Sequence, residues 1–170
     1  MVRVLVEKEK VVERIAELGK ELTSYYRNRE LVLVMLANGG VFFAVDLARQ
    51  IELDFPVDII AAASYKNDRQ GEELTFRCPP KLDLSGKSVL LVDEVLDSGN
   101  TLARTVEELK KLGASEVKTA VLVTKERERG KNALQCADWS CFSLPDVYLV
   151  GCGLDSKELC RNLTYLGVME

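Results

Sequence analysis

The chain has 170 residues, of which 47% are hydrophobic and 29% are charged, and its formal net charge is -4. This composition is typical of one globular domain with a sizeable core, and the acidic balance argues against a protein that coats nucleic acid. No stretch approaches the roughly 20 apolar residues of a membrane-spanning helix, and the N-terminus lacks the apolar core of a secretory signal.

The chain contains five cysteines and no histidine. The odd number of cysteines and the absence of a CxxC pair argue against a zinc site. We expect reduced thiols and a cytoplasmic location. Without histidine, any acid-base chemistry must use another side chain.

Helical and strand-like patterns alternate from the N-terminus. Apolar residues recur at steps of three and four over residues 8–26 and predict an amphipathic helix. The continuous apolar run 31–36 predicts a strand buried on both faces. Residues 41–51 then read as a helix, and 57–62 as a strand that ends at Ser64 and Tyr65. The polar residues 66–73 predict a mobile loop, and residues 74–77 a short strand.

The alternation continues with a strand at 88–95, a helix at 101–112 closed by Gly113, and a strand at 117–124. It predicts an α/β fold with an open, mainly parallel twisted sheet flanked by helices. After Lys125 come a charged segment and short β-like pieces at 139–143, 148–151 and 165–169. We expect one domain over residues 1–170, with a core of about 8–125 and a small C-terminal β cap of about 126–170 over the strand ends.

The segment VLLVDEVLDSGNT, residues 89–101, leads from a buried strand into a helix. Ligands of open α/β sheets bind at such strand ends. Residues 98–101 could bind a phosphate through backbone N–H groups and hydroxyls, and Gly99 would let the backbone approach it closely. The segment is neither a P-loop nor a GxGxxG turn. Capping of the helix is the simpler alternative for these residues.

Capping does not explain Asp93 and Glu94, because two acids at the end of a buried strand are costly unless they bind something. Sugar hydroxyls or a magnesium ion would suit them. A phosphate beside a polyol describes a ribose 5-phosphate. Asp97, which lies between the two parts, could then serve as a base or stabilise charge at the anomeric carbon.

These residues resemble a known family. VLLVDEVLDSGNTL is similar to the phosphoribosyl-pyrophosphate (PRPP) signature of the type I phosphoribosyltransferases: a hydrophobic run, two acids, two hydrophobic residues, then Asp-Ser/Thr-Gly-x-Thr. Three further segments resemble the hypoxanthine-guanine branch, and the likeness extends over residues 31–168. They are LANGGVFFAVDLA, VDIIAAASYKND and LPDVYLVGCGLDSKELCRNLTYLGV.

The resemblance implies a purine salvage enzyme that uses Mg²⁺ to transfer the phosphoribosyl group from PRPP to hypoxanthine or guanine. It implies that Asp97 handles the proton at N7 of the purine, and that a flexible loop at Ser64 and Tyr65 closes over the site. It further implies that the ribose is bound by Asp93 and Glu94, and the metal by Asp155 with Asp93 and Glu94. The implied 5-phosphate ligands are Asp97, Ser98, Gly99, Asn100 and Thr101, and the implied pyrophosphate ligands are Asn38, Gly39, Gly40 and Arg161. The implied purine ligands are Lys125, Tyr148 and Leu149.

The sequence departs from the family at two of these positions. The acids stand in the order Asp-Glu where the best-known members have Glu-Asp, and Asn38 stands where the family often has Lys or Arg. Pyrophosphate binding would then depend more on backbone N–H groups. The resemblance also implies a non-proline cis peptide bond entering Asn38.

Four of the implied roles have plain structural alternatives. Tyr148 could be a core aromatic, Lys125 a solvated lysine, Asp155 a cap for the segment that follows it, and Arg161 a surface arginine.

Other functions also remain open at this stage. The same chemistry could act on xanthine, adenine or uracil, and a regulator could use this fold to sense PRPP. The acidic balance counts against a nucleic-acid partner. The resemblance implies a homo-oligomer, either a dimer or a tetramer.

Overall fold

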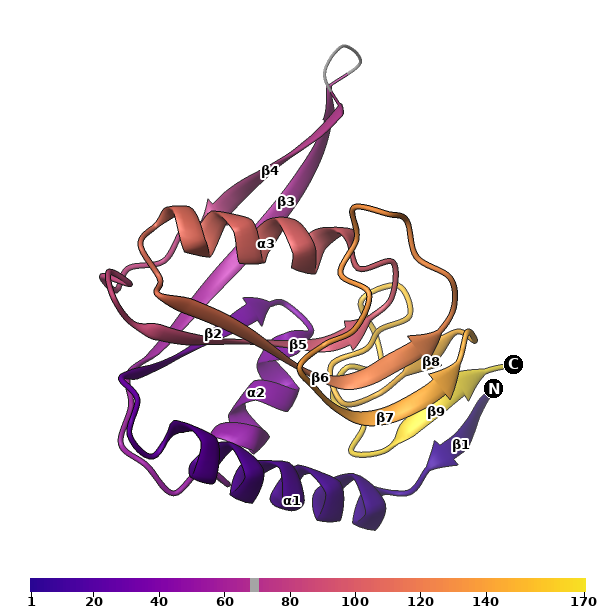
Figure 1. The fold of residues 1–170 in the computed structure, drawn as a ribbon. Coiled ribbons are helices and arrows are strands. Elements are labelled where there is room, and N and C mark those ends of the chain that lie inside the picture. The colour runs from indigo at the N-terminus through magenta and orange to yellow at the C-terminus, as the bar shows by residue number, and fades with distance from the viewer. Residues whose placement is uncertain (68–70) are drawn as a thin grey trace.

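A six-stranded sheet in the order β4-β3-β2-β5-β6-β7 forms the centre of the molecule (Figure 1). The computed structural model describes the backbone of residues 1–67 and 71–170, and the side chains of these residues except 63–75. The elements are β1 (Val2–Val6), α1 (Lys8–Tyr26), β2 (Leu31–Ala37), α2 (Gly40–Ala48), β3 (Val57–Asn67), β4 (Gly71–Cys78), β5 (Ser88–Leu96), α3 (Asn100–Lys111), β6 (Glu116–Glu126), β7 (Trp139–Pro145), β8 (Leu149–Val150) and β9 (Leu166–Met169).

Helices cover both faces of this sheet, with α1 and α2 on one face and α3 on the other (Figure 1). Alternate residues of β2 therefore enter different cores: Leu33 and Met35 pack toward α1 and α2, and Val34 and Leu36 pack toward α3. Burial on both faces explains why β2 is apolar without alternation. The predicted α/β fold is confirmed. None of the helices in the described ranges is long and apolar enough to cross a membrane.

The predicted helices are confirmed, with one difference in length. α1 occupies the predicted residues and buries the stripe Val11, Ile15, Leu18 and Leu22. α2 ends at Ala48, three residues before the predicted end. The chain tightens there, because the N–H groups of residues 50 and 51 bond to carbonyls three positions earlier, and a tighter last turn is common at helix ends.

The prediction of a loop over residues 66–73 was wrong within the described backbone. β3 continues to Asn67 and β4 starts at Gly71, and the two strands pair antiparallel in a hairpin that projects from the sheet (Figure 1). Strand pairing is made by backbone groups and so does not require an apolar sequence. Ser64 and Tyr65 lie on β3, and their side chains lie outside the description.

The cap also differs from the prediction in its strands. β1, which the sequence did not suggest, pairs with β9, and β9 pairs with β8, so that both ends of the chain build one three-stranded sheet. β7, expected in the cap, instead extends the main sheet parallel to β6. Because β1 is short and mostly accessible to solvent, it lacks the buried apolar pattern by which strands are predicted.

Candidate functional site

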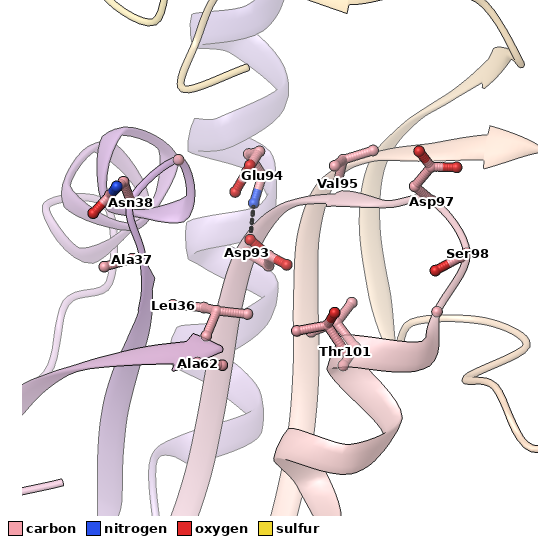
Figure 2. Close-up of a pocket in the computed structure, with 13 residues that line it drawn as sticks. Leu36, Ala37, Asn38, Ala62, Asp93, Glu94, Val95, Asp97, Ser98 and Thr101 are labelled. Atoms are coloured by element: carbon pink, nitrogen blue, oxygen red, sulfur yellow. Dashed lines mark hydrogen bonds between the residues drawn. The ribbon is translucent and has the colours of Figure 1, made fainter. Parts of the chain in front are cut away.

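A pocket of about 250 Å³ opens at the carboxyl ends of β2 and β5, where the chain turns into α2 and α3 (Figure 2). Figure 2 shows the β2–α2 loop with Asn38 on one side of Asp93, and the β5–α3 loop with Ser98 on the other. The pocket is lined by Leu36, Ala37, Asn38, Gly39, Ala62, Asp93, Glu94, Val95, Asp97, Ser98, Gly99, Thr101 and Leu102. The structure therefore brings together most of the residues predicted to bind phosphate, sugar and pyrophosphate, whereas Gly40, Asn100 and Arg161 do not line the pocket.

Two helix N-termini border this pocket. α2 follows the N-cap residue Gly39, and α3 follows Gly99, and no described side chain caps either helix at these residues. Nearby, Ser98 Oγ accepts only a long contact of 3.4 Å from the N–H of Asn100. Uncapped N-termini leave N–H donors and a partial positive charge available. The first turns of α2 and α3 are thus suited to anions, and helix capping does not explain the residues at 98–101.

Glycines allow the β2–α2 loop and the β5–α3 loop each to pack closely against neighbouring residues. Gly99 has a φ of +77°, and a Cβ there would lie 2.4 Å from the carbonyl oxygen of Leu134. A Cβ at Gly39 would lie 2.2 Å from Oε1 of Glu94. Larger residues at these positions would displace the loops that border the pocket. The peptide bond between Ala37 and Asn38 is cis, as the family resemblance implied.

Asp93 and Glu94 lie between the two helix N-termini. The N–H of Glu94 donates a 2.9 Å hydrogen bond to Asp93 Oδ1 (Figure 2). Burial of the Asp93 carboxyl, with the negative charge of Glu94 as the second cause, raises the pKa of Asp93 well above its usual value. A carboxyl whose charged form is disfavoured, at the wall of a pocket, is typical of a ligand site.

The metal-binding side chains predicted from sequence do not all meet. Among the described side chains, which exclude those of residues 63–75, no three acidic, cysteine or histidine groups gather into a metal site. Asp155 instead pairs with Arg161 at 2.9 Å and accepts a 2.8 Å hydrogen bond from the N–H of Glu158. Magnesium usually takes one or two carboxylates and completes its shell with water and substrate oxygens. The adjacent carboxylates of Asp93 and Glu94 fit that requirement.

Arg161 is largely buried within the loop after β8 and is not a solvated surface arginine, but it does not line the pocket. Only 18% of its side chain is exposed, and its Nη1 donates a 2.8 Å hydrogen bond to the carbonyl of Gly153. Gly153 in turn packs on the β2–α2 loop, because a Cβ there would lie 2.2 Å from the carbonyl oxygen of Gly39. The loop after β8 therefore contacts the predicted pyrophosphate loop. Asp155 serves both as a cap and as the ion-pair partner of Arg161.

Of the residues predicted to bind the base, Lys125 lies at the carboxyl end of β6, Tyr148 lies just before β8, and Leu149 begins β8. Lys125 Nζ lies 3.4 Å from Asp97 Oδ2, and only 13% of the Lys125 side chain is exposed, so Lys125 is not a solvated lysine. Tyr148 is 55% exposed and so is not a core aromatic, whereas its neighbour Leu149 is buried. Tyr148 is two residues after Asp146, which lies 3.4 Å from Lys125 Nζ, and an exposed ring can stack on a flat, polar base.

Two arginines of the charged segment contact this end of the site, and the sequence did not suggest either role. Arg127 Nη1 lies 2.7 Å from Asp97 Oδ1. Arg129 donates hydrogen bonds of 2.6 to 3.4 Å to five main-chain carbonyls, which belong to Leu96, Asp97, Lys125, Arg127 and Gln135. The run of alternating charges at 125–129 is visible in the sequence, but such a run is more often a solvated face.

The sequence and the structure were both compared with known proteins, and the matches agree with one another. The sequence model of the phosphoribosyl transferase domain matches residues 3–157. The chain is 33% identical to the hypoxanthine-guanine phosphoribosyltransferase of Bacillus subtilis, over 99% of this chain and 93% of that protein. It is 32% identical to the bifunctional protein TilS/HprT of Listeria innocua, of which it spans only 26%. A crystal structure of a hypoxanthine phosphoribosyltransferase from Staphylococcus aureus superposes with a TM-score of 0.91 at 29% identity, covering 99% of this chain and 91% of that one.

Proposed function

The chain belongs to the phosphoribosyl transferase domain family, and we propose that it is a purine salvage enzyme. In this proposal it transfers the 5-phosphoribosyl group of PRPP to a 6-oxopurine, hypoxanthine or guanine, and releases pyrophosphate. The likeness to the Bacillus subtilis enzyme over nearly the full length of both chains supports this choice of substrates.

The observation that carries the proposal is the placement of two carboxylates between two uncapped helix N-termini in one pocket. PRPP has a matching order of groups, with a phosphate at one end, a pyrophosphate at the other and sugar hydroxyls between them. The 5-phosphate would bind at the start of α3, on residues 98–101. The pyrophosphate would bind on residues 38–40 with Arg161, and Asp93 and Glu94 would accept hydrogen bonds from the ribose hydroxyls.

Asp93 and Glu94 would also hold magnesium together with oxygens of PRPP, and Asp155 would contact it through water. The bound metal would neutralise charge on the leaving pyrophosphate. Holding a sugar hydroxyl or a cation would relieve the unfavourable burial of the Asp93 charge, which supports this assignment.

Asp97 and Lys125 would act on the base. With the purine stacked on Tyr148, Lys125 would donate to the 6-oxo group, the backbone of Leu149 would read the purine edge, and Asp97 would accept the proton of N7. The 3.4 Å separation of Lys125 Nζ and Asp97 Oδ2 supports this, because both groups can then reach neighbouring atoms of one purine ring. Alignment of base and anomeric carbon would supply much of the rate enhancement.

Closure over the site is assigned to the β3–β4 hairpin, whose first strand carries Ser64 and Tyr65. Exclusion of water would protect the activated sugar from hydrolysis.

We further assign the chain one domain, a cytoplasmic location and a homo-oligomeric state, a dimer or a tetramer. The five free cysteines support a reducing compartment. An apolar hollow of about 430 Å³ between α1 and α2, beside the exposed side chains of Val12 and Phe42, would suit a contact between copies. Size-exclusion chromatography with light scattering would measure the oligomeric state.

The decisive experiment for the function is a panel of bases. The protein is incubated with PRPP, Mg²⁺ and hypoxanthine, guanine, xanthine, adenine or uracil in turn, and nucleotide and pyrophosphate are measured. We expect product with hypoxanthine or guanine. Product with adenine or uracil alone would contradict the assignment of a 6-oxopurine, and no product with any base would contradict transfer itself.

A further inference from the structure

Four charged side chains form a closed ring at the base end of the site. Lys125 Nζ lies 3.4 Å from both Asp97 Oδ2 and Asp146 Oδ1. Arg127 Nη1 lies 2.7 Å from Asp97 Oδ1 and 3.5 Å from Asp146 Oδ2. The ring contains two cations and two anions, so its formal charges balance. Asp97 and Lys125 are the residues assigned above to the base, whereas Arg127 and Asp146 have no role in the proposed reaction.

Both carboxylate oxygens of Asp97 have a cationic partner in this arrangement. Oδ1 faces Arg127 and Oδ2 faces Lys125, and the contact with Arg127 is the shorter of the two. A purine N–H can donate to Asp97 only if an oxygen is free to accept it. Arg127 therefore competes with the base for the same carboxylate.

Asp146 offers Arg127 an alternative partner. Its Oδ2 is already within ion-pair distance of the nitrogen that contacts Asp97. A small movement of the Arg127 guanidinium toward Asp146 would release Asp97 without leaving an unpaired charge, and unpaired charges are the costly outcome when ion pairs break. The side chains of Asp97, Arg127 and Asp146 are all about 40% exposed, so each pair is weak enough to exchange.

The backbone around Arg127 is fixed, which limits the exchange to its side chain. The N–H of Arg127 donates a 3.0 Å hydrogen bond to the carbonyl of Lys125. The carbonyl of Arg127 accepts a 3.4 Å contact from Arg129 Nη1. Arg129 also binds the carbonyl of Asp97. The backbones of Arg127 and Asp97 are therefore both held by the side chain of Arg129.

Resting on the proposed transfer to a purine, we infer that Arg127 is a positioning residue that alternates between two carboxylates. Without a base the Arg127 guanidinium pairs with the carboxylate of Asp97, and when the base binds it pairs with that of Asp146 instead. The exchange sets the affinity for the base and leaves the binding of PRPP unchanged, because neither Arg127 nor Asp146 lines the pocket assigned to PRPP.

The test is the KM for hypoxanthine at saturating PRPP and Mg²⁺, compared with the KM for PRPP. Arg127→Met keeps the aliphatic stem but removes the competing cation, so its KM for hypoxanthine falls about two- to fivefold, the range expected for an exposed ion pair. Arg127→Lys restores the charge and returns this KM to within about twofold of the wild-type value. The exposed neighbour Lys131 provides the control, since Lys131→Met changes neither KM.

Two further measurements separate the exchange from a structural role of Arg127. Asp146→Asn removes the alternative partner and raises the KM for hypoxanthine, but this effect disappears in the Arg127→Met background. Raising KCl from about 50 to about 500 mM screens the ring, so the same KM falls in the wild type more than in Arg127→Met.

An unchanged or higher KM for hypoxanthine in an active, folded Arg127→Met variant would overturn the inference while the proposed function stands. Failure of the wild-type protein to form nucleotide from any base would overturn both, and it would be seen before any variant is made.

Discussion

Arg129 Nε donates a 2.8 Å hydrogen bond to the main-chain carbonyl of Asp97, and so a loop residue fixes the backbone that carries the proposed catalytic carboxylate. The same guanidinium binds the carbonyl of Lys125 at 2.6 Å through Nη2. The ends of β5 and β6 are thereby joined by one side chain at the point where the base is expected to bind.

Replacing Arg129 by Met should lower both stability and turnover. Five carbonyls lose a charged donor, and we expect a loss of about 1–3 kcal/mol in the free energy of unfolding. Chemical denaturation would measure this loss, and steady-state kinetics should show a lower kcat. Arg129→Lys should recover little of either, because an ammonium cannot reproduce the planar set of five donors. Full recovery by lysine would contradict this account.

Asp97→Asn should lower kcat about 10²- to 10⁴-fold, the usual range for loss of a general base. The KM for PRPP should change little, since the α3 N-terminus and residues 38–40 remain. Pyrophosphate release at saturating hypoxanthine would measure kcat. Glu107→Gln, on an exposed position of α3, serves as the control. A variant as active as the wild type would exclude the role of Asp97.

Asp93→Asn should stabilise the protein in the absence of PRPP and metal at neutral pH. The pKa of Asp93 is raised in the folded state by burial and by Glu94, so the folded chain retains a proton that the unfolded chain releases. The contribution of Asp93 to stability is therefore present at low pH and is lost as the pH rises toward the folded pKa. Asparagine cannot ionise, so the gain in melting temperature should grow as the pH rises above the ordinary pKa of an aspartate, about 4.

The control for this experiment is Asp54→Asn at an exposed position, which should show no such trend. A gain for Asp93→Asn that does not depend on pH would contradict the assigned cause. Activity should be lost in the same variant, because the proposed ribose ligand is removed.

Gly153→Ala should weaken PRPP binding. A Cβ there would lie 2.2 Å from the carbonyl oxygen of Gly39, and the φ of +105° is unfavourable for alanine. Overpacking of this kind costs about 1–3 kcal/mol, and the predicted pyrophosphate loop would have to shift. Gly130→Ala is a matched control, because a Cβ there meets nothing within 4 Å. Calorimetric titration with Mg-PRPP should give a lower affinity for Gly153→Ala than for Gly130→Ala. Equal affinities would contradict the proposed contact.

Asn38→Lys should strengthen PRPP binding. Asn38 is exposed at the pocket and carries no charge, and a lysine there would approach the pyrophosphate as a point charge. We expect the KM for PRPP to fall, and to fall less at high salt because the added charge is screened. A KM that stays the same at low salt would indicate that this position does not face the pyrophosphate.

The sheet and the two loops proposed to bind phosphate, at residues 38–40 and 98–101, could be predicted because their signals are local. The stripe of α1 and the apolar runs of β2 and β5 reflect burial, and residues 88–101 contain a whole strand, a turn and a helix start within one short segment. The family resemblance supplied the cis bond before Asn38, which composition and periodicity could not.

The features that could not be predicted depend on partners distant in the chain. β1 has a weak pattern and becomes a strand only through its pairing with β9. The β3–β4 hairpin extends over polar residues through backbone bonds that leave no apolar pattern. Arg127 and Arg129 resemble any solvated charges in sequence, and their roles follow only from the positions of Asp97 and of the β5 carbonyls.

The small sheet has a consequence for the order in which the protein assembles. Leu149 lies on β8, which pairs with β9, and β9 pairs with β1. Met1 and Glu170, 169 positions apart, are joined by a 3.0 Å hydrogen bond beside that pairing. Contacts between such distant segments form late, because most of the chain must be ordered first. We expect the loops at residues 38–40 and 98–101 to be ordered before the strand pairing that positions Leu149 is complete.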